Sequence, residues 1–154
     1  MPNEINPFNG TLVRAEIIRK HGNIRPEMFI WGDEVEFVFR VLHEGARVGT
    51  VTTAKFNHPA NQRKTFAVGS FARLTECPPK FSRFFYRNSG FYTWRYRGAV
   101  QALGKMAAYT IFLALKARFL ELAKFWLYYL DGLTNGFVLP PSRKALLSRI
   151  RIVP

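Results

Sequence analysis

The stretch FIWGDEVEFVFR at residues 29–40 concentrates acidic side chains in a basic chain. Three of the chain's ten acidic residues, Asp33, Glu34 and Glu36, lie there directly behind Trp31. The chain as a whole is strongly basic, because 23 Lys and Arg leave a formal net charge of +13. Such a local exception indicates either an ordinary helix start or a site at which a carboxylate takes part in chemistry.

A helix is predicted over residues 33–44, with Asp33 as its N-cap and Gly45 at its end. Acidic residues in a first turn favour the positive end of the helix dipole. Glu36 could reach back as in a capping box, and it lies four residues before Arg40, a favourable spacing for an ion pair. The apolar residues that recur at helical spacing are Val35, Val38, Phe39, Val41 and Leu42.

Further elements are expected on both sides of this helix. An extended segment at 7–13 should precede a helix at 14–21, which Gly22 would end. After residue 45, the Val- and Thr-rich segment 46–56 favours a strand, and 57–80 is expected to be irregular. The remaining expected elements are helices at 81–98 and at 99–130, the latter ending near Asp131–Gly132.

Composition limits the class of protein. The 154 residues suffice for one domain, and 48% hydrophobic with 16% aromatic residues argue against disorder. The net charge predicts attraction to nucleic acid, to an acidic membrane surface or to phosphorylated ligands. Cys77 is the only cysteine, which excludes an internal disulfide and favours a reduced, intracellular thiol. No signal peptide is visible, and the longest apolar run, 106–115, is about half of a membrane span.

Four segments, in this order and spacing, resemble family-two glycosyltransferases of the GT-A fold, most closely the bacterial rhamnosyl- and galactofuranosyltransferase branch. They are FNGTLVRAEIIRKHG (8–22), the stretch 29–40, HEGARVGTV (43–51) with NHP (57–59), and RNSGFYTWRYRG (87–98). DGLTNGF at 131–137 is similar to the closing segment of that branch.

The resemblance implies an α/β fold: a partial GT-A glycosyltransferase core on the acceptor side, followed by a helical C-terminal region. Its expected parts are the core at 1–60, a connecting loop at 61–80, an aromatic, basic helical region at 81–137 and a basic tail at 138–154.

The same resemblance assigns roles to the acidic stretch. One carboxylate of Asp33 and Glu34 would be the general base that takes the proton from an acceptor hydroxyl, because a neutral hydroxyl is a poor nucleophile. The branch usually has Asp-Asp or Glu-Asp where this chain has Asp-Glu, and position favours Glu34. Glu36 and Arg40 would hold the helix in place, and Trp31 would line the acceptor subsite with an apolar face.

Two further sites follow from the resemblance. His58 would bind the Mg or Mn ion that neutralises the diphosphate leaving group. Taken alone, a His before a Pro is an ordinary loop residue. Asn9 and Gly10 would border the acceptor site, where Gly10 admits a ligand close to the backbone. Locally the same pair reads equally as a simple Asn-Gly turn.

The donor side has no counterpart in this sequence, since no Asp-x-Asp occurs anywhere in it. We therefore expect the C-terminal portion of an inverting glycosyltransferase, inactive without a nucleotide-binding half that a separate chain could supply. Its partners would be a nucleotide sugar and a cell-envelope glycan or polyprenyl-linked acceptor. The expected location is the cytoplasm, at the inner face of the cell membrane.

The basic helical region allows other interpretations. Its apolar band could lie on an anionic membrane, or could pack against the core or against a second copy. Nucleic-acid binding is disfavoured, because no such motif accompanies the charge. The alternative function is a non-enzymatic basic membrane-surface or protein-interaction module. The band consists of Phe112, Leu115, Phe119, Leu122, Phe125 and Trp126.

Overall fold

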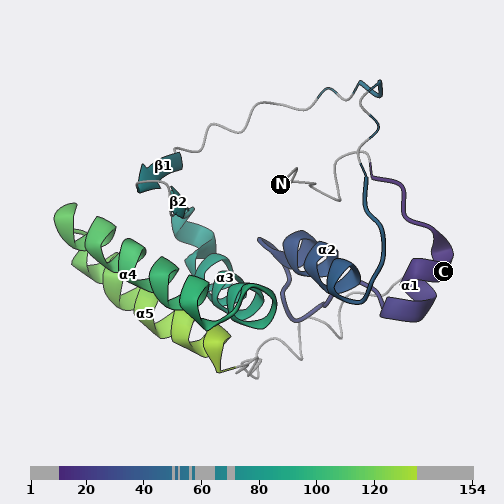
Figure 1. The fold of residues 1–154 in the computed structure, drawn as a ribbon. Helices are drawn as coiled ribbons and strands as arrows, with labels where there is room; N and C mark the ends of the chain where they lie inside the picture. The colour runs from purple at the N-terminus through teal and green to yellow at the C-terminus, as the bar shows by residue number, and fades with distance from the viewer. Residues whose placement is uncertain are drawn as a thin grey trace.

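The computed structural model describes residues 11–49, 51, 53–55, 57, 65–68 and 72–134. This part of the chain is mostly helical, with one two-stranded antiparallel sheet (Figure 1). In chain order the elements are α1 (Ala15–His21), α2 (Asp33–His43), β1 (Thr65–Val68), β2 (Ala72–Thr75), a 3-10 turn (Pro79–Phe81), α3 (Ser82–Arg97), α4 (Ala99–Leu115) and α5 (Phe119–Leu133). No helix among these residues is both long enough and apolar enough to span a membrane.

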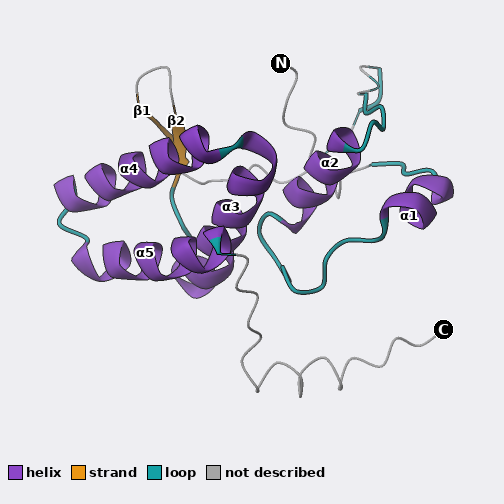
Figure 2. Cartoon of the chain, turned by 60° about the horizontal axis from the view of Figure 1, so that its bottom comes forward, coloured by secondary structure: helices purple, strands orange, loops and turns teal. Residues whose placement is uncertain are grey.

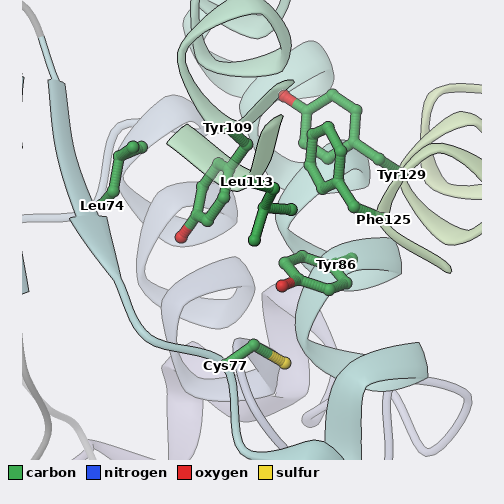
Figure 3. Packing of buried hydrophobic residues seen from close by; sticks show 7 residues of the cluster. All are labelled: Leu74, Cys77, Tyr86, Tyr109, Leu113, Phe125 and Tyr129. Atoms are coloured by element: carbon green, nitrogen blue, oxygen red, sulfur yellow. The ribbon is translucent and has the colours of Figure 1, made fainter. Parts of the chain in front are cut away.

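The core lies where α3, α4 and α5 meet (Figure 2). Its rings pack both edge to face and stacked: Tyr86 and Phe125 have centroids 5.1 Å apart at 82°, and Tyr109 and Phe125 have centroids 5.2 Å apart at 26°. The buried tyrosines also have partners for their hydroxyls, since Tyr109 donates to the Thr75 carbonyl at 3.0 Å and Tyr129 to the Ala102 carbonyl at 2.9 Å. Figure 3 shows the cluster: Leu74, Cys77, Tyr86, Tyr109, Leu113, Phe125 and Tyr129. Cys77 is buried in this cluster, and its thiol donates to the Pro78 carbonyl at 3.5 Å.

Glycines bring α3 and α5 into backbone contact. A Cβ added at Gly90 would lie 2.5 Å from the Tyr129 carbonyl oxygen, and one at Gly132 would overlap the Arg87 carbonyl. Neither position can carry a side chain without moving a helix backbone. Helix α3 therefore packs directly on the backbone of α5. Other buried residues of α3 contact the segment before α2.

The strands lie elsewhere than predicted. Residues 46–49, 51 and 53–55 form no strand, so the expected strand at 46–56 is wrong for that part. Instead β1 and β2 pair within the segment expected to be irregular, with Thr65 opposite Thr75 and Val68 opposite Ala72. A Val- and Thr-rich run forms a strand only where a partner and a buried face exist, and Leu74 provides that face against α4.

The predicted long helix at 99–130 is two helices. The chain turns at Ala117, whose φ is 51°, and α5 runs back beside α4 (Figures 1 and 2). Leu115 and Phe119 flank this turn and are 81% and 66% exposed, whereas Phe125 is fully buried. The proposed single apolar band is therefore wrong, because periodicity does not reveal a turn between two apolar segments.

Helices α1 and α3 agree closely with the predicted ranges, and α2 differs at its start. The N-cap of α2 is Gly32, with φ 97°, and no side chain caps the helix. Asp33 is the first helical residue, so its predicted N-cap role and the capping box are wrong. Of the predicted apolar stripe, Val41 is buried and Leu42 is exposed, and the other buried residues of α2 are Glu36, Phe37 and Arg40. The Glu36 carboxylate is unavailable for capping because it binds other groups, described below.

The GT-A fold and the four-part division at residues 60, 80 and 137 stay predictions. The segment 1–10, the tail 138–154 and residue 58 lie outside the described residues.

Candidate active site at the start of helix α2

The turn before α2 has a strained backbone. Phe29 and Trp31 have φ values of 63° and 68°, and Gly32 follows with 97°. A non-glycine residue with positive φ costs on the order of 1–3 kcal/mol and persists only where its surroundings hold it. Gly32 is required here for a second reason, since an added Cβ would lie 2.9 Å from the Tyr92 ring on α3.

Two fully buried polar residues of α3, Arg87 and Asn88, hold this turn. The two N–H groups of the Asn88 amide are shared among three carbonyls, those of Met28 at 2.9 Å, Ile30 at 3.1 Å and Trp31 at 2.9 Å. Arg87 donates to the Glu27 carbonyl at 2.6 Å and to the Asn88 side-chain oxygen at 3.0 and 3.2 Å. One helix thus supplies hydrogen-bond donors to four carbonyls of the strained turn, of which the Met28 carbonyl also accepts from the Ile30 N–H at 2.8 Å.

Asp33 and Glu34 occupy the first turn of α2 and are half-buried. The Gly32 N–H donates to Glu34 Oε2 at 3.1 Å. Burial, followed by the hydrogen bond and negative charge of Asp33, raises the pKa of Glu34 to about 7, against the lowering effect of the backbone N–H groups of Glu34 and Gly32. A carboxyl with this pKa can accept a proton near neutral pH, as a general base must.

The predicted Glu36–Arg40 ion pair is present, and it is buried. Glu36 Oε1 lies 3.0 Å from Arg40 Nε and 3.1 Å from Arg25 Nε, and it accepts a hydrogen bond from the Tyr96 hydroxyl at 2.8 Å. Arg40 also donates to the carbonyls of His21 and Asn23. This network joins α2 to the segment after α1 and to α3, so it supports the helix that carries Asp33 and Glu34. Burial and the Glu36 carboxylate together raise the pKa of Tyr96 to about 12.

Trp31 lies close to the acidic pair in sequence, and its ring packs on the start of α3. The ring centroid is 6.1 Å from that of Phe81 and 6.5 Å from that of Phe85. Its neighbour Phe29 is 49% exposed and packs on Phe84 at 5.1 Å. The acceptor-subsite role of Trp31 stays a prediction, and Phe29 is a second, more exposed aromatic residue of the same turn.

The remaining predicted site residues stay untested. Asn9, Gly10 and the metal ligand His58 lie outside the described residues. The described part of the chain contains no group of three or more His, Cys, Asp or Glu that could hold a metal ion. It does have a hollow of about 430 Å³ beside α1, lined by Glu16, Ile17, Lys20, His21, Gly45 and Ala46 and therefore separate from the acidic pair.

Asn88 lies in the segment 87–98 that resembles glycosyltransferases, but the sequence patterns gave this residue no role of its own. The signal was a pair of polar residues, Arg87–Asn88, in the middle of an aromatic helix. Polar side chains at such positions are buried only when hydrogen-bonded, so the pair indicated a structural partner.

Comparison with known proteins supports a glycosyltransferase relationship, as predicted. The chain is 33% identical over 93 residues to the galactofuranosyltransferase GlfT1 of Mycolicibacterium smegmatis. It is 36% identical over 95 residues to GlfT1 of Mycobacterium tuberculosis, in two strains. Each match covers 59% of this chain and 31% of the relative's length. No protein-family model and no solved structure matches.

Proposed function

We propose that this chain forms the acceptor side and the C-terminal helices of an inverting glycosyltransferase. The enzyme would move a sugar from a nucleotide sugar to a cell-envelope glycan or polyprenyl-linked acceptor. The observation that carries the proposal is the half-buried Glu34 carboxyl, with a pKa near 7, at the start of α2 beside Asp33. The relationship to galactofuranosyltransferases supports a galactofuranose donor.

The chemistry needs one base. Glu34 takes the proton of an acceptor hydroxyl as the hydroxyl oxygen bonds to the anomeric carbon. On the opposite face, the bond from that carbon to the diphosphate oxygen breaks, and the leaving group keeps the electron pair. The configuration inverts, and the proton remains on Glu34. Asp33 contributes negative charge that keeps the pKa of Glu34 high enough to accept the proton.

The donor side requires groups that these residues do not supply. The sequence has two aspartates, Asp33 and Asp131, and no Asp-x-Asp. A Mg or Mn ion would assist departure of the diphosphate, with His58 as one ligand and the other ligands from a nucleotide-binding part. The purified 154-residue chain should therefore show no transfer alone, and steady turnover of a nucleotide sugar by this chain would contradict this part of the proposal.

The test uses an enzyme in which this chain is joined or mixed with a nucleotide-binding part and is supplied with a nucleotide-activated galactofuranose. Glu34→Gln removes the base and should lower kcat by about 10²–10⁴-fold with little change in KM. Asp33→Asn should lower kcat less and shift the acid limb of the pH profile to lower pH. Full activity of Glu34→Gln would contradict the assignment of the base.

A membrane-surface role has its own support. Large apolar side chains are exposed along α4 and α5 of a chain with a net charge of +13. Such a surface can insert between lipids while basic residues contact anionic headgroups. This role is compatible with a lipid-linked acceptor, and it is also the main alternative if transfer fails. The exposed residues include Val100, Leu103, Ile111, Leu115, Phe119, Leu120, Leu127 and Leu130.

A further inference from the structure

The peptide group between Trp31 and Gly32 is bound on both of its sides. Its carbonyl oxygen accepts a hydrogen bond from the Asn88 amide at 2.9 Å. Its N–H, which belongs to Gly32, donates to Glu34 Oε2 at 3.1 Å. A trans peptide is planar and carries these two groups on opposite edges, so fixing one edge fixes the direction of the other.

We propose that Asn88 is a positioning residue for Glu34, acting through the Trp31–Gly32 peptide group. This inference rests on the proposed role of Glu34 and adds a residue that lies on another helix. If the whole peptide group rotated about the line between the Cα atoms of Trp31 and Gly32, its carbonyl would leave Asn88 and its N–H would leave Glu34, so both hydrogen bonds would be lost together. Asn88 thereby determines whether an N–H group faces the Glu34 carboxylate.

The Asn88 amide is itself held in one orientation. Arg87 donates to its oxygen from Nε at 3.2 Å and from Nη2 at 3.0 Å. The amide nitrogen must therefore face the turn, where it meets the carbonyls of Met28 and Ile30 as well as Trp31. A rotated amide would place its oxygen against three carbonyls, so the hydrogen-bond network permits one arrangement.

The strained backbone of the turn before α2 explains why it needs support from Asn88. Phe29 and Trp31 have positive φ, a conformation that is costly for L-residues and needs support from the surroundings. Asn88 and Tyr92, one turn apart on α3, close on Gly32 from the same side. A short strained loop held from a neighbouring helix gives a carboxylate a fixed position and a fixed donor, as preorganised sites require.

The charged form of Glu34 should depend on this arrangement. The Gly32 N–H lowers the pKa of Glu34, whereas burial and Asp33 raise it. Among the described residues, the ionisable group acting on Glu34 is Asp33 on the same helix, and Arg87 is the charged group bonded to Asn88. Loss of the Asn88 donor should therefore raise the pKa of Glu34 further, because the Gly32 N–H would no longer be directed at it.

The test is solution NMR of the complete 154-residue chain. In the unmodified protein, the Gly32 amide proton should titrate with the same midpoint as the Glu34 side-chain carboxyl carbon. In Asn88→Ala, exchange of the Gly32 amide with solvent should quicken about tenfold, and the Glu34 midpoint should rise by about a few tenths of a pH unit. Asn88→Ser keeps one donor and should give intermediate values, and it replaces the alanine variant if that variant does not fold.

The matched control is Tyr129→Phe, which removes a buried hydrogen bond from a side chain to a carbonyl at the contact of α4 and α5. It should leave the Gly32 amide and the Glu34 midpoint unchanged. The inference is overturned if Asn88→Ala, like Tyr129→Phe, leaves the Gly32 amide exchange rate and the Glu34 midpoint unchanged. It is also overturned if the chemical shift of the Gly32 amide proton in the unmodified protein does not change as Glu34 titrates.

These outcomes are separable from the fate of the proposed function. Full turnover by the Glu34→Gln enzyme would remove the base assignment while the NMR coupling stood. An inactive Glu34→Gln enzyme with no response at Gly32 would leave the function standing and remove Asn88 from it.

Discussion

Glu34 shows how burial can outweigh a favourable helix end. The positive end of a helix dipole stabilises a carboxylate by roughly 0.3–1 kcal/mol, which is less than about one pH unit of pKa. Burial and Asp33 act in the opposite direction and raise the pKa of Glu34 from 4.5 to about 7. Burial and Asp33 therefore outweigh the helix dipole. Glu34, which sequence patterns alone assign to helix stability, is as a result suited to accept a proton.

The raised pKa of Glu34 should make the free energy of unfolding depend on pH. The folded state binds more protons than the unfolded state between about pH 4.5 and 7, so the Glu34 contribution is most favourable below pH 4.5 and is lost as the pH rises through 7. Glu34→Gln should therefore leave stability nearly unchanged at pH 4 and increase it at pH 8. Because the side chain is partly exposed, we expect a gain of about 1 kcal/mol, measured by urea unfolding at both pH values. An equal effect at the two pH values would contradict the raised pKa.

Glu36 differs from Glu34 because its charge is fully paired. It has no exposed surface and neutralises Arg40, whose side chain is 10% exposed. Glu36→Ala would leave a buried arginine without its partner and should lower the free energy of unfolding by about 3 kcal/mol, measured by urea denaturation.

The control is the pair Arg14–Glu16, whose side chains are 81% and 57% exposed. Glu16→Ala should change stability by less than about 1 kcal/mol. If the two variants lost the same stability, the buried network would not support α2 in the way described.

At the scale of the helices, α3 is unusual because much of its buried face is polar. Arg87, Asn88 and Ser89 are buried together with Tyr86 and Phe91. The polar residues bind the turn before α2, while the aromatic residue Tyr86 joins the core with α4 and α5. One helix thus connects the hydrophobic core to the acidic site, which explains why a mixed aromatic and polar sequence is stable there.

The packing of α3 on α5 gives a prediction at this scale. Gly90→Ala would push a methyl group against the Tyr129 carbonyl oxygen, which cannot move without shifting α5. We expect a loss of about 2–3 kcal/mol in thermal or urea unfolding. Gly104 on α4 has nothing within 4 Å of an added Cβ, so Gly104→Ala should gain up to about 1 kcal/mol from helix propensity. Equal effects of the two alanines would contradict the close backbone contact.

At the scale of the whole molecule, charge and exposed apolar surface predict binding to anionic vesicles. Leu120 and Leu127 on α5 are 84% and 65% exposed. Burial of a leucine in the lipid gains about 1.5–3 kcal/mol, so Leu120→Glu and Leu127→Glu should each weaken binding about tenfold or more in co-sedimentation.

Leu12→Glu serves as the control, because Leu12 is 99% exposed but lies before α1. It should bind vesicles nearly as the unmodified chain does. Binding should also weaken with added salt, since exposed charges are screened beyond about 8–10 Å. No preference for anionic over neutral vesicles would contradict the proposal.

Local patterns in the sequence were sufficient for several elements. The helices at 14–21 and 33–44 follow from the glycines that end them and, for the second, from apolar spacing, signals that act over a few neighbouring residues; the helix at 81–98 was also predicted close to its observed range. The same holds for the Glu36–Arg40 pair, which spans one helical turn. The resemblance to glycosyltransferases was likewise predicted from short sequence segments that follow one another in a given order and spacing.

Features that depend on distant partners required the folded chain. Asn88 meets the Trp31 carbonyl across 57 residues, and Tyr96 meets Glu36 across 60. The strand pairing at 65–75 and the reversal at Ala117 depend on what α4 and α5 pack against. Local periodicity specifies which residues can form a helix. Burial by distant residues decides which carboxylate is neutralised by arginines and which has a pKa near 7.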